Sequence, residues 1–272
     1  MGPLAKRVLV ALAAIPLLLG LTFYPQPLAF KIVVVAALLL ALEELFRMAS
    51  DKRTAPLRWV SHLCLLAILV PVLAPNLLFF KDRESVVVGL LFLSLTFLFS
   101  SRPPQEMLPA VSLSYFSVLY FGFLGGYFLL LRDLPRGSWL LLFVYVATWG
   151  YDTGGYFAGR FFGRHKMTPQ VSPKKSWEGA LGGLALSVAA LAGLWACFPV
   201  YKEIFGLGDI LILGLLMSLF GQLGDLVESM IKRSLFAKDS GSFFPGHGGI
   251  FDRIDSLLFN APVLFYYLTL RP

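Results

Sequence analysis

The stretch "GDILILGLLMSLFGQLGDLVESMI", Gly208 to Ile231, decides the fold, because it is almost continuously apolar over the length of a membrane-spanning helix. A helix of about 20 residues crosses the roughly 30 Å of hydrocarbon in a bilayer. The apolar residues form a run and do not alternate with polar ones, which argues against a strand of a transmembrane barrel. Two carboxylates, Asp225 and Glu228, lie near the end of the run. We therefore predict a transmembrane helix with acidic groups at membrane depth.

The rest of the chain has the same apolar character. Of its 272 residues, 57% are hydrophobic and 14% are charged, whereas a soluble domain carries roughly 25% charged residues. An ordinary core could not bury so much apolar surface, so the expected solvent is a bilayer. The predicted fold is all-α, a polytopic membrane protein with a bundle of about nine transmembrane helices. The predicted spans are residues 6–22, 28–46, 59–79, 84–100, 109–131, 139–158, 178–200, 208–231 and 255–270.

The basic residues orient the predicted helices. The first apolar segment follows Lys6 and Arg7 and lacks a small-residue cleavage site after it, so we expect a retained helix with a cytoplasmic N-terminus. This orientation puts most of the 23 basic residues on the cytoplasmic side. The two loops richest in Lys and Arg, 159–177 and 232–254, both lie on that side. The net charge of +7 then reflects attraction to anionic lipid headgroups and does not indicate nucleic acid as a partner. We expect a multi-pass protein of the cell membrane with its active site facing the cytoplasm.

Two regions are expected along the chain. Residues 1–138 form about five spans, and these spans contain few buried charges; Glu43 and Glu44 sit near a helix end. Residues 139–272 place polar and ionisable side chains inside the spans and contain both rich loops, so the chemistry is expected there. The apolar helix faces would permit a homodimer, although no motif demands one.

The first candidate site is the acidic face of the stretch quoted above. Positions i, i+3, i+4 and i+7 of a helix share one face, and here they hold Asp225, Glu228, Ser229 and Lys232. Carboxylates inside a membrane are costly, and two of them one turn apart repel each other unless a cation or a shared proton lies between them. A functional site is one interpretation, and an internal ion pair with Arg or Lys of another helix is the alternative.

The loop 159–177 and the helices beside it form the second candidate. Asp152 is another carboxylate at membrane depth, and several cations, among them Arg160, follow it. Glycines at small-xxx-small spacing indicate close helix packing; they are Gly150, Gly154, Gly155, Gly159, Gly179 and Gly183. The segment "SPKKSWEG" gathers hydroxyl and amine groups just before a helix begins, where they could cradle phosphate oxygens. These residues are Ser172, Lys174, Lys175 and Ser176. A solvated loop bound to acidic lipids is the alternative.

The third candidate is "KRSLFAKDSGSFFPGHGGIFDRID", Lys232 to Asp255, which gathers charge and glycine in an otherwise apolar chain. Glycines around His247 allow positive φ angles and close backbone approach to a ligand. Asp252 and Asp255 lie one turn apart at the start of the last helix, where acidic residues also serve as ordinary caps. Carboxylates for a divalent metal, together with Lys and Arg for phosphate oxygens, are typical of phosphoryl or nucleotidyl transfer with magnesium. We therefore predict a phosphate-bearing substrate at the cytoplasmic face.

At these residues the sequence resembles the phosphatidate cytidylyltransferases. The segment "SMIKRSLFAKDSGSFFPGHGGIFDRID", Ser229 to Asp255, is similar to their signature, S-x-x-K-R, then K-D, then H-G-G-x-x-D-R-x-D, with every fixed position present. The segment from Asp152 to Lys166 and "SPKKSWEG" also look like this family. The resemblance implies that CTP and phosphatidate react to give CDP-diacylglycerol and pyrophosphate. It also implies magnesium dependence and a site at the cytoplasmic membrane surface.

The residue patterns and the resemblance together define the expected site. Magnesium, with room for a second cation, is expected at Asp225, Asp252, Glu228, Asp152 and Asp255. The catalytic set comprises Asp225, Lys232, Arg233, Lys238, Asp239, His247, Asp252 and Arg253. The substrate-binding set comprises Ser172, Lys174, Lys175, Ser176, Arg160, Ser229, Gly248 and Gly249. In this hypothesis a phosphatidate oxygen attacks the α-phosphorus of CTP in line, while the basic side chains neutralise the triphosphate and the departing pyrophosphate.

Two other functions stay open. A CTP-dependent lipid-alcohol kinase of the dolichol kinase type would transfer the γ-phosphate, but the H-G-G-x-x-D-R-x-D segment argues against it. An ion-coupled transporter would use Asp152, Asp225 and Glu228 as an ion path, but charges gathered at one face and the lack of inverted repeats in the sequence argue against that.

Overall fold

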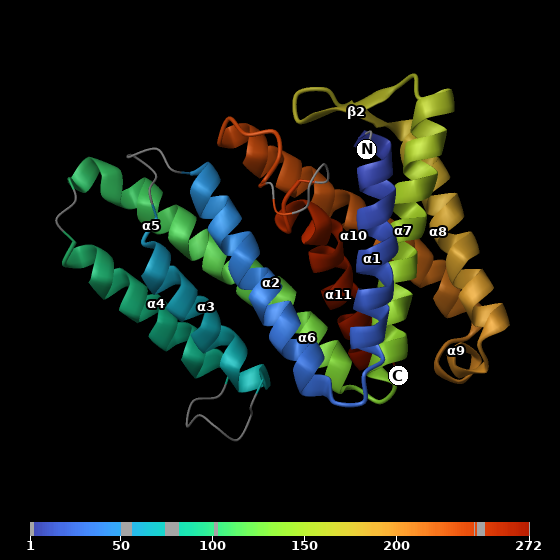
Figure 1. Ribbon diagram of the computed structural model, residues 1–272, viewed down its shortest axis with the longest axis horizontal. Coiled ribbons are helices and arrows are strands. Elements are labelled where there is room, and N and C mark those ends of the chain that lie inside the picture. Colours follow the sequence, from blue (N-terminus) through green and yellow to red (C-terminus); the bar gives the residue numbers. More distant parts are fainter. Residues whose placement is uncertain are drawn as a thin grey trace. The chain divides into compact units, whose positions relative to one another are not determined.

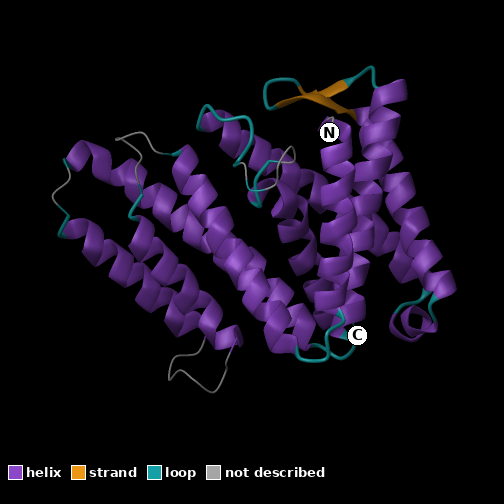
Figure 2. Cartoon of the chain, viewed as in Figure 1, coloured by secondary structure: helices purple, strands orange, loops and turns teal. Residues whose placement is uncertain are grey.

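The computed structural model describes residues 3–49, 56–73, 82–100, 103–241, 243 and 248–271, and this part of the chain is mostly helical (Figures 1 and 2). The N-terminal elements are α1 (Pro3–Thr22), α2 (Pro27–Met48), α3 (Arg58–Leu73), α4 (Asp82–Leu98), α5 (Pro104–Leu119), the π-helical turn η1 (Tyr120–Leu124) and α6 (Gly125–Asp133). The C-terminal elements are α7 (Gly137–Phe162), β1 (Lys166–Thr168), β2 (Ser172–Ser176), α8 (Trp177–Cys197), α9 (Pro199–Ile204), α10 (Leu207–Ser234) and α11 (Phe251–Leu270).

The predicted apolar segments fall on helices, with ends shifted by a few residues, and the segment 109–131 covers α5, η1 and α6. Residues 74–79 of the predicted segment 59–79 lie outside the described residues. Within the described residues, three helical stretches are long and apolar enough to cross a membrane, and they support a membrane protein. They are Pro104–Asp133, Trp177–Cys197 and Leu207–Ser234. The full number of about nine transmembrane helices and the cytoplasmic N-terminus stay predictions.

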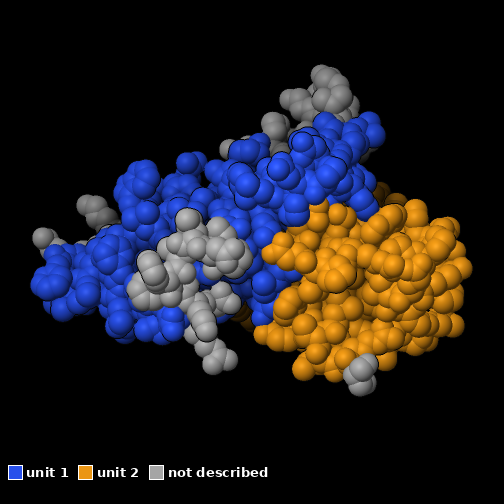
Figure 3. Space-filling view, turned by 90° about the horizontal axis from the view of Figure 1, so that it is seen from below, with its two compact units in different colours: residues 1–130, 235–252 blue, residues 131–234, 253–272 orange. Residues whose placement is uncertain are grey.

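The chain forms two compact units, coloured separately in Figure 3. One comprises residues 1–130 and 235–252, and the other comprises residues 131–234 and 253–272. A short segment near the end of the chain therefore belongs to the N-terminal unit. The predicted division after residue 138 separated about five N-terminal spans from the region expected to carry the catalytic residues. That division stays a prediction.

The N-terminal unit is built around α3, which packs against α2, α4, α5 and η1. One part of its core consists of Cys64, Ile68, Leu93, Phe97, Ala110 and Val118. The segment 235–252 contributes Phe251, a fully buried ring whose centroid lies 5.1 Å from that of Phe121. Burying such a side chain stabilises the fold by about 1.5–3 kcal/mol. This contact holds the segment 235–252 in the N-terminal unit.

The other unit is built around the closely packed helices α7 and α8, with α10 lying against both. Glycines allow α7 and α8 to approach each other closely. A Cβ at Gly154 would overlap the backbone oxygen of Gly182, and a Cβ at Gly183 would lie 2.8 Å from the backbone oxygen of Tyr151. The predicted helix-packing role is therefore confirmed for Gly154 and Gly183.

The two long loops are shorter and more structured than the sequence predicted. In the loop 159–177, α7 runs beyond Arg160, and residues 166–176 form an antiparallel hairpin of β1 and β2. The expectation of helices and loops alone is wrong here, because the chain turns back outside the apolar segments and strand pairing satisfies its backbone groups. In the loop 232–254, α10 and α11 take up both ends.

Candidate active site

Three carboxylates from two helices meet in the C-terminal unit. Asp225 and Glu228 lie on α10, and Asp255 lies on α11. One oxygen from each of the three lies within 4.8 Å of the other two. Glu228 is buried, with 1% of its surface exposed. This carboxylate cluster brings together three of the five predicted metal ligands.

Two glycines on α10 explain how α11 comes close enough to complete the carboxylate cluster. A Cβ at Gly221 would lie 2.9 Å from Asn260 Nδ2, and a Cβ at Gly224 would lie 2.6 Å from the backbone oxygen of Asp255. Asn260 in turn donates a hydrogen bond to Thr148 Oγ1 at 2.9 Å, which joins α11 to α7. A side chain at Gly224 would push α11 away from α10. The packing of α11 against α10, and not spacing along one helix, therefore brings Asp255 to the carboxylate cluster.

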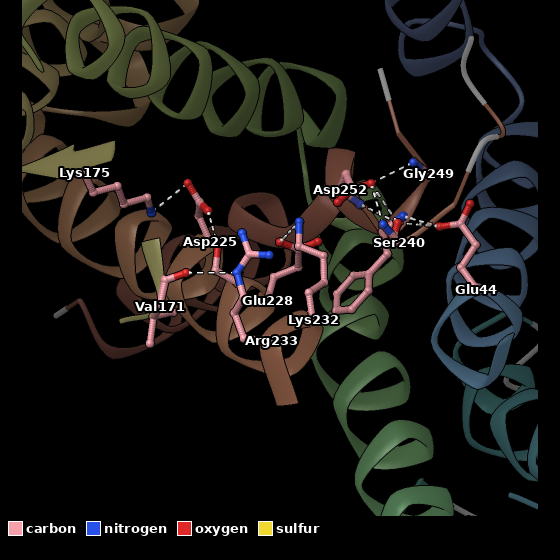
Figure 4. Close-up of polar contacts among 12 residues, drawn as sticks. Glu44, Val171, Lys175, Asp225, Glu228, Lys232, Arg233, Ser240, Gly249 and Asp252 are labelled. Carbon is pink, nitrogen blue, oxygen red and sulfur yellow. Dashed lines mark hydrogen bonds and ion pairs between the residues drawn. The ribbon is translucent and has the colours of Figure 1, made fainter. Parts of the chain in front are cut away.

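Two lysines pair with the carboxylate cluster (Figure 4). Lys175 Nζ, from strand β2, lies 2.7 Å from Asp225 Oδ2, and Lys232 Nζ lies 2.7 Å from Glu228 Oε2. Ion pairs are therefore present at this acidic face, but neither is the pair with another helix that the alternative interpretation expected, because Lys175 lies on a strand and Lys232 on α10 itself. With all three carboxylates ionised, these five side chains carry an excess of negative charge, because three carboxylates face two ammonium groups. A bound cation would balance that excess.

The surroundings of the carboxylate cluster suit a magnesium ion. All its donors are carboxylate oxygens, and magnesium prefers carboxylates completed by water and phosphate oxygens. Asp152 on α7 lies within Coulombic range of Asp225 and Lys175. Next to it, Tyr151 donates a hydrogen bond to Gln222 Oε1 at 2.6 Å, which joins α7 to α10. Four of the five predicted metal ligands thus share one electrostatic environment, and their donor set fits the implied ion.

Asp252, the fifth predicted ligand, has different partners. Its Oδ2 atom accepts hydrogen bonds from Ser240 N at 3.0 Å, Ser240 Oγ at 2.9 Å and Gly249 N at 2.8 Å (Figure 4). Gly248 has a φ of 82°, and a Cβ there would overlap the Asp252 carboxylate, so this turn requires glycine. Asp252 therefore holds the turn that precedes α11, and its role as a metal ligand stays a prediction.

Glu44 contacts the same turn, and the sequence did not single it out. It lies on α2 with 8% of its surface exposed. Its carboxylate accepts hydrogen bonds from Ser240 Oγ at 3.0 Å, Ile250 N at 2.9 Å and Phe251 N at 2.9 Å (Figure 4). The signal in the sequence is an acidic pair, Glu43 and Glu44, near the end of an apolar segment.

The remaining predicted residues are more dispersed. Arg160 Nη1 donates to Tyr156 Oη on its own helix at 2.8 Å, and Arg233 Nε donates to a backbone oxygen of the hairpin turn at 3.5 Å. Ser176 is buried and caps α8 by accepting a hydrogen bond from Gly179 N at 3.2 Å. The half-buried members are Lys175, Lys232, Ser172 and Ser229. The exposed members are Lys174, Lys238, Asp239 and Arg253. His247 lies outside the described residues.

Comparison with known proteins gives one family. The family model described as "Cytidylyltransferase family" matches residues 5–271. The phosphatidate cytidylyltransferase of Bacillus subtilis is 34% identical over 279 residues, covering 99% of each chain. That of Staphylococcus aureus is 35% identical over 229 residues, covering 83% of this chain and 84% of the relative. That of Synechocystis is 31% identical over 290 residues, covering 96% of this chain and 93% of the relative.

Proposed function

Because the chain belongs to the cytidylyltransferase family and is a nucleotidyltransferase, we propose that it acts as a phosphatidate cytidylyltransferase of the plasma membrane. CMP passes from CTP to phosphatidate, giving CDP-diacylglycerol and pyrophosphate. The observation that carries the proposal is the carboxylate cluster on α10 and α11 with its paired lysines, set among apolar helices. Metal-binding oxygens beside ammonium groups are what a triphosphate substrate needs.

The carboxylates of the cluster and the two lysines beside them have different proposed roles. Asp225, Glu228 and Asp255 would hold magnesium, and Asp152 lies within Coulombic range of Asp225. Bound there, the ion would neutralise phosphate charge and orient the CTP phosphates. Lys175 and Lys232 lie directly beside these carboxylates. Their ammonium groups would bind the triphosphate oxygens and stabilise the departing pyrophosphate.

The proposed step is an in-line displacement at phosphorus. An oxygen of the phosphatidate phosphate bonds to the α-phosphorus of CTP, while the bond from that phosphorus to the bridging oxygen breaks and pyrophosphate leaves with the electron pair. A phosphate monoester dianion is already a nucleophile, so the protein needs no strong general base. Positioning and charge neutralisation carry reactions of this kind. The fixed lysines and carboxylates of this chain supply both.

The site is proposed to face the cytoplasm. Lys175 reaches Asp225 from the basic loop 159–177, so this loop and the carboxylate cluster lie at the same end of α10. Loops rich in Lys and Arg beside transmembrane helices are typically cytoplasmic. CTP would then arrive from the aqueous phase and phosphatidate from the inner leaflet.

The test follows the two phosphorus labels of CTP. Purified protein in detergent micelles containing phosphatidate or a polyprenol is supplied with magnesium and with CTP labelled at the α- or the γ-phosphorus. We expect the α label in lipid, with the γ label in pyrophosphate, only when phosphatidate is present. The γ label in polyprenol would identify a lipid-alcohol kinase instead. Transfer of neither label by folded protein would overturn the proposed function.

A further inference from the structure

Glu44 binds two short segments that lie far along the chain. Its Oε2 atom accepts hydrogen bonds from Ser240 Oγ at 3.0 Å, 196 residues away, and from Phe251 N at 2.9 Å, 207 residues away. Its Oε1 atom accepts from Ile250 N at 2.9 Å. The first N–H groups of a helix have no partner within the helix, so Glu44 serves as an N-cap that α2 supplies to α11. Because the carboxylate is almost fully buried, these charge-assisted bonds are strong.

Two glycines make room for the Glu44 carboxylate. A Cβ at Gly241 would lie 2.7 Å from Glu44 Oε1, and a Cβ at Gly249 would overlap Glu44 Oε2. The sequence predicted that glycines here allow close approach of the backbone to a ligand. At Gly249 the group that approaches closely is a carboxylate of the chain itself, and substrate binding by this glycine stays a prediction.

Ser240 connects Glu44 with Asp252. Its hydroxyl oxygen lies 3.0 Å from Glu44 Oε2 and 2.9 Å from Asp252 Oδ2. A hydroxyl has one hydrogen, so it donates fully to one carboxylate at a time. Backbone N–H groups bind both carboxylates as well, that of Gly249 at Asp252 and that of Phe251 at Glu44. The two acidic side chains are therefore held in place by the same short stretch of chain.

We propose that Glu44 is a positioning residue, which fixes the first turn of α11 and with it Asp252 and Asp255 for nucleotidyl transfer. This inference rests on the proposed function. Glu44→Gln keeps one acceptor oxygen and puts an NH2 group in place of the other, so the amide of Ile250 or that of Phe251 would lose its acceptor and the first turn of α11 would fray. Both aspartates lie in or next to that turn. Glu44 acts through them, from α2, and is not itself assigned a contact with substrate.

The test compares Glu44→Gln with Glu43→Gln. Glu43 is the matched control, because it lies on the same helix but pairs with Arg47 at 3.0 Å and Arg58 at 3.2 Å. Hydrogen exchange of the peptide 248–255 is measured alongside CMP transfer per folded protein. We expect Glu44→Gln to speed exchange of this peptide, to lower kcat about 10- to 100-fold and to raise the half-saturating magnesium concentration, as loss of groups that orient metal ligands does. Glu43→Gln should change none of these.

A second variant keeps the test decisive if Glu44→Gln fails to fold. Ser240→Ala removes one contact of Glu44 and one of Asp252 and leaves the contacts of Glu44 with Ile250 and Phe251, so it should give the same changes in smaller measure. A lower melting temperature with unchanged kcat and magnesium dependence would overturn the positioning role and leave the proposed function intact. Unchanged hydrogen exchange would also overturn it. Wild-type protein without CMP transfer would overturn the proposed function, and the positioning role with it.

Discussion

Replacing Gly224 by alanine should separate α10 from α11 and disable the carboxylate cluster. A Cβ at this position would lie 2.6 Å from the backbone oxygen of Asp255, 2.9 Å from Phe259 Cδ2 and 3.1 Å from Ser256 Cα. Ordinary van der Waals contact begins near 3.4 Å. Two of these three neighbours are backbone atoms of α11, which cannot rotate away. The helix would therefore have to move by about 0.8 Å, the difference between 3.4 Å and 2.6 Å.

Such a shift has an effect on stability and a larger one on activity. Overpacking of this kind costs about 1–3 kcal/mol, and each kcal/mol lowers the Tm of a chain of this size by roughly 2–4 °C. The same shift withdraws Asp255 from Asp225 and Glu228. Misplacing a group in an active site by about 1 Å can cost about 100-fold in rate. We therefore expect Gly224→Ala to fold, to melt several degrees lower and to transfer CMP about 100-fold more slowly.

The matched control for Gly224→Ala is Gly208→Ala on the same helix. Among the described residues, no atom lies within 4 Å of a Cβ at Gly208. The assay is the initial rate at which α-labelled CTP enters lipid at saturating magnesium, together with thermal unfolding of both variants in detergent. If folded Gly224→Ala transferred CMP as fast as Gly208→Ala, the close approach of α11 would not matter for the reaction. The assignment of Asp255 to the site would then be wrong.

Three further substitutions test the site and the packing around it. Asp225→Asn should lower CMP transfer at least about 100-fold, because it removes a charged ligand and the partner of Lys175; initial rates at limiting magnesium check this, and near wild-type rates would remove Asp225 from the ligand set. Lys175→Gln should raise the KM for CTP roughly tenfold, whereas Lys202→Gln, at an exposed position on α9, should leave the KM unchanged; equal KM values for the two variants in steady-state kinetics would show that the assignment of Lys175 is mistaken. Gly154→Ala should lower the free energy of unfolding by about 1–3 kcal/mol, because its Cβ would overlap the backbone of α8. In the described part of the chain a Cβ at Gly193 meets no atom within 4 Å. Gly193→Ala, the matched control on α8, should therefore unfold at the same temperature as the wild type.

Features set by a single helix were predictable from the sequence. Asp225, Glu228 and Lys232 share one face because the helical repeat fixes their directions, and the ion pair between Glu228 and Lys232 confirms this. The apolar segments also located the helices to within a few residues, because an apolar run in a bilayer has few other ways to satisfy its backbone. Local spacing and solvent alone determine both features.

Contacts between distant segments could not be predicted in the same way. Lys175 meets Asp225 because a hairpin folds back toward α10, and its strands of three and five residues are too short to show an alternating pattern. Glu44 meets Ser240 across 196 residues, and no spacing in a single sequence indicates such a pair. The position of Glu44 near a helix end was predictable, but its partners depend on tertiary packing.

Asp252 and Asp255 look equivalent in the sequence, one turn apart in one acidic segment, yet the structure gives them different partners. Asp252 Oδ2 accepts three hydrogen bonds, from Ser240 and Gly249, so that oxygen is already engaged with the chain. Asp255 instead has an oxygen within 4.8 Å of the carboxylates on α10. Successive residues of a helix point about 100° apart, so moving either aspartate by one position would turn it away from its partners. The spacing of the two aspartates therefore lets one turn of α11 hold the preceding segment with Asp252 and complete the carboxylate cluster with Asp255.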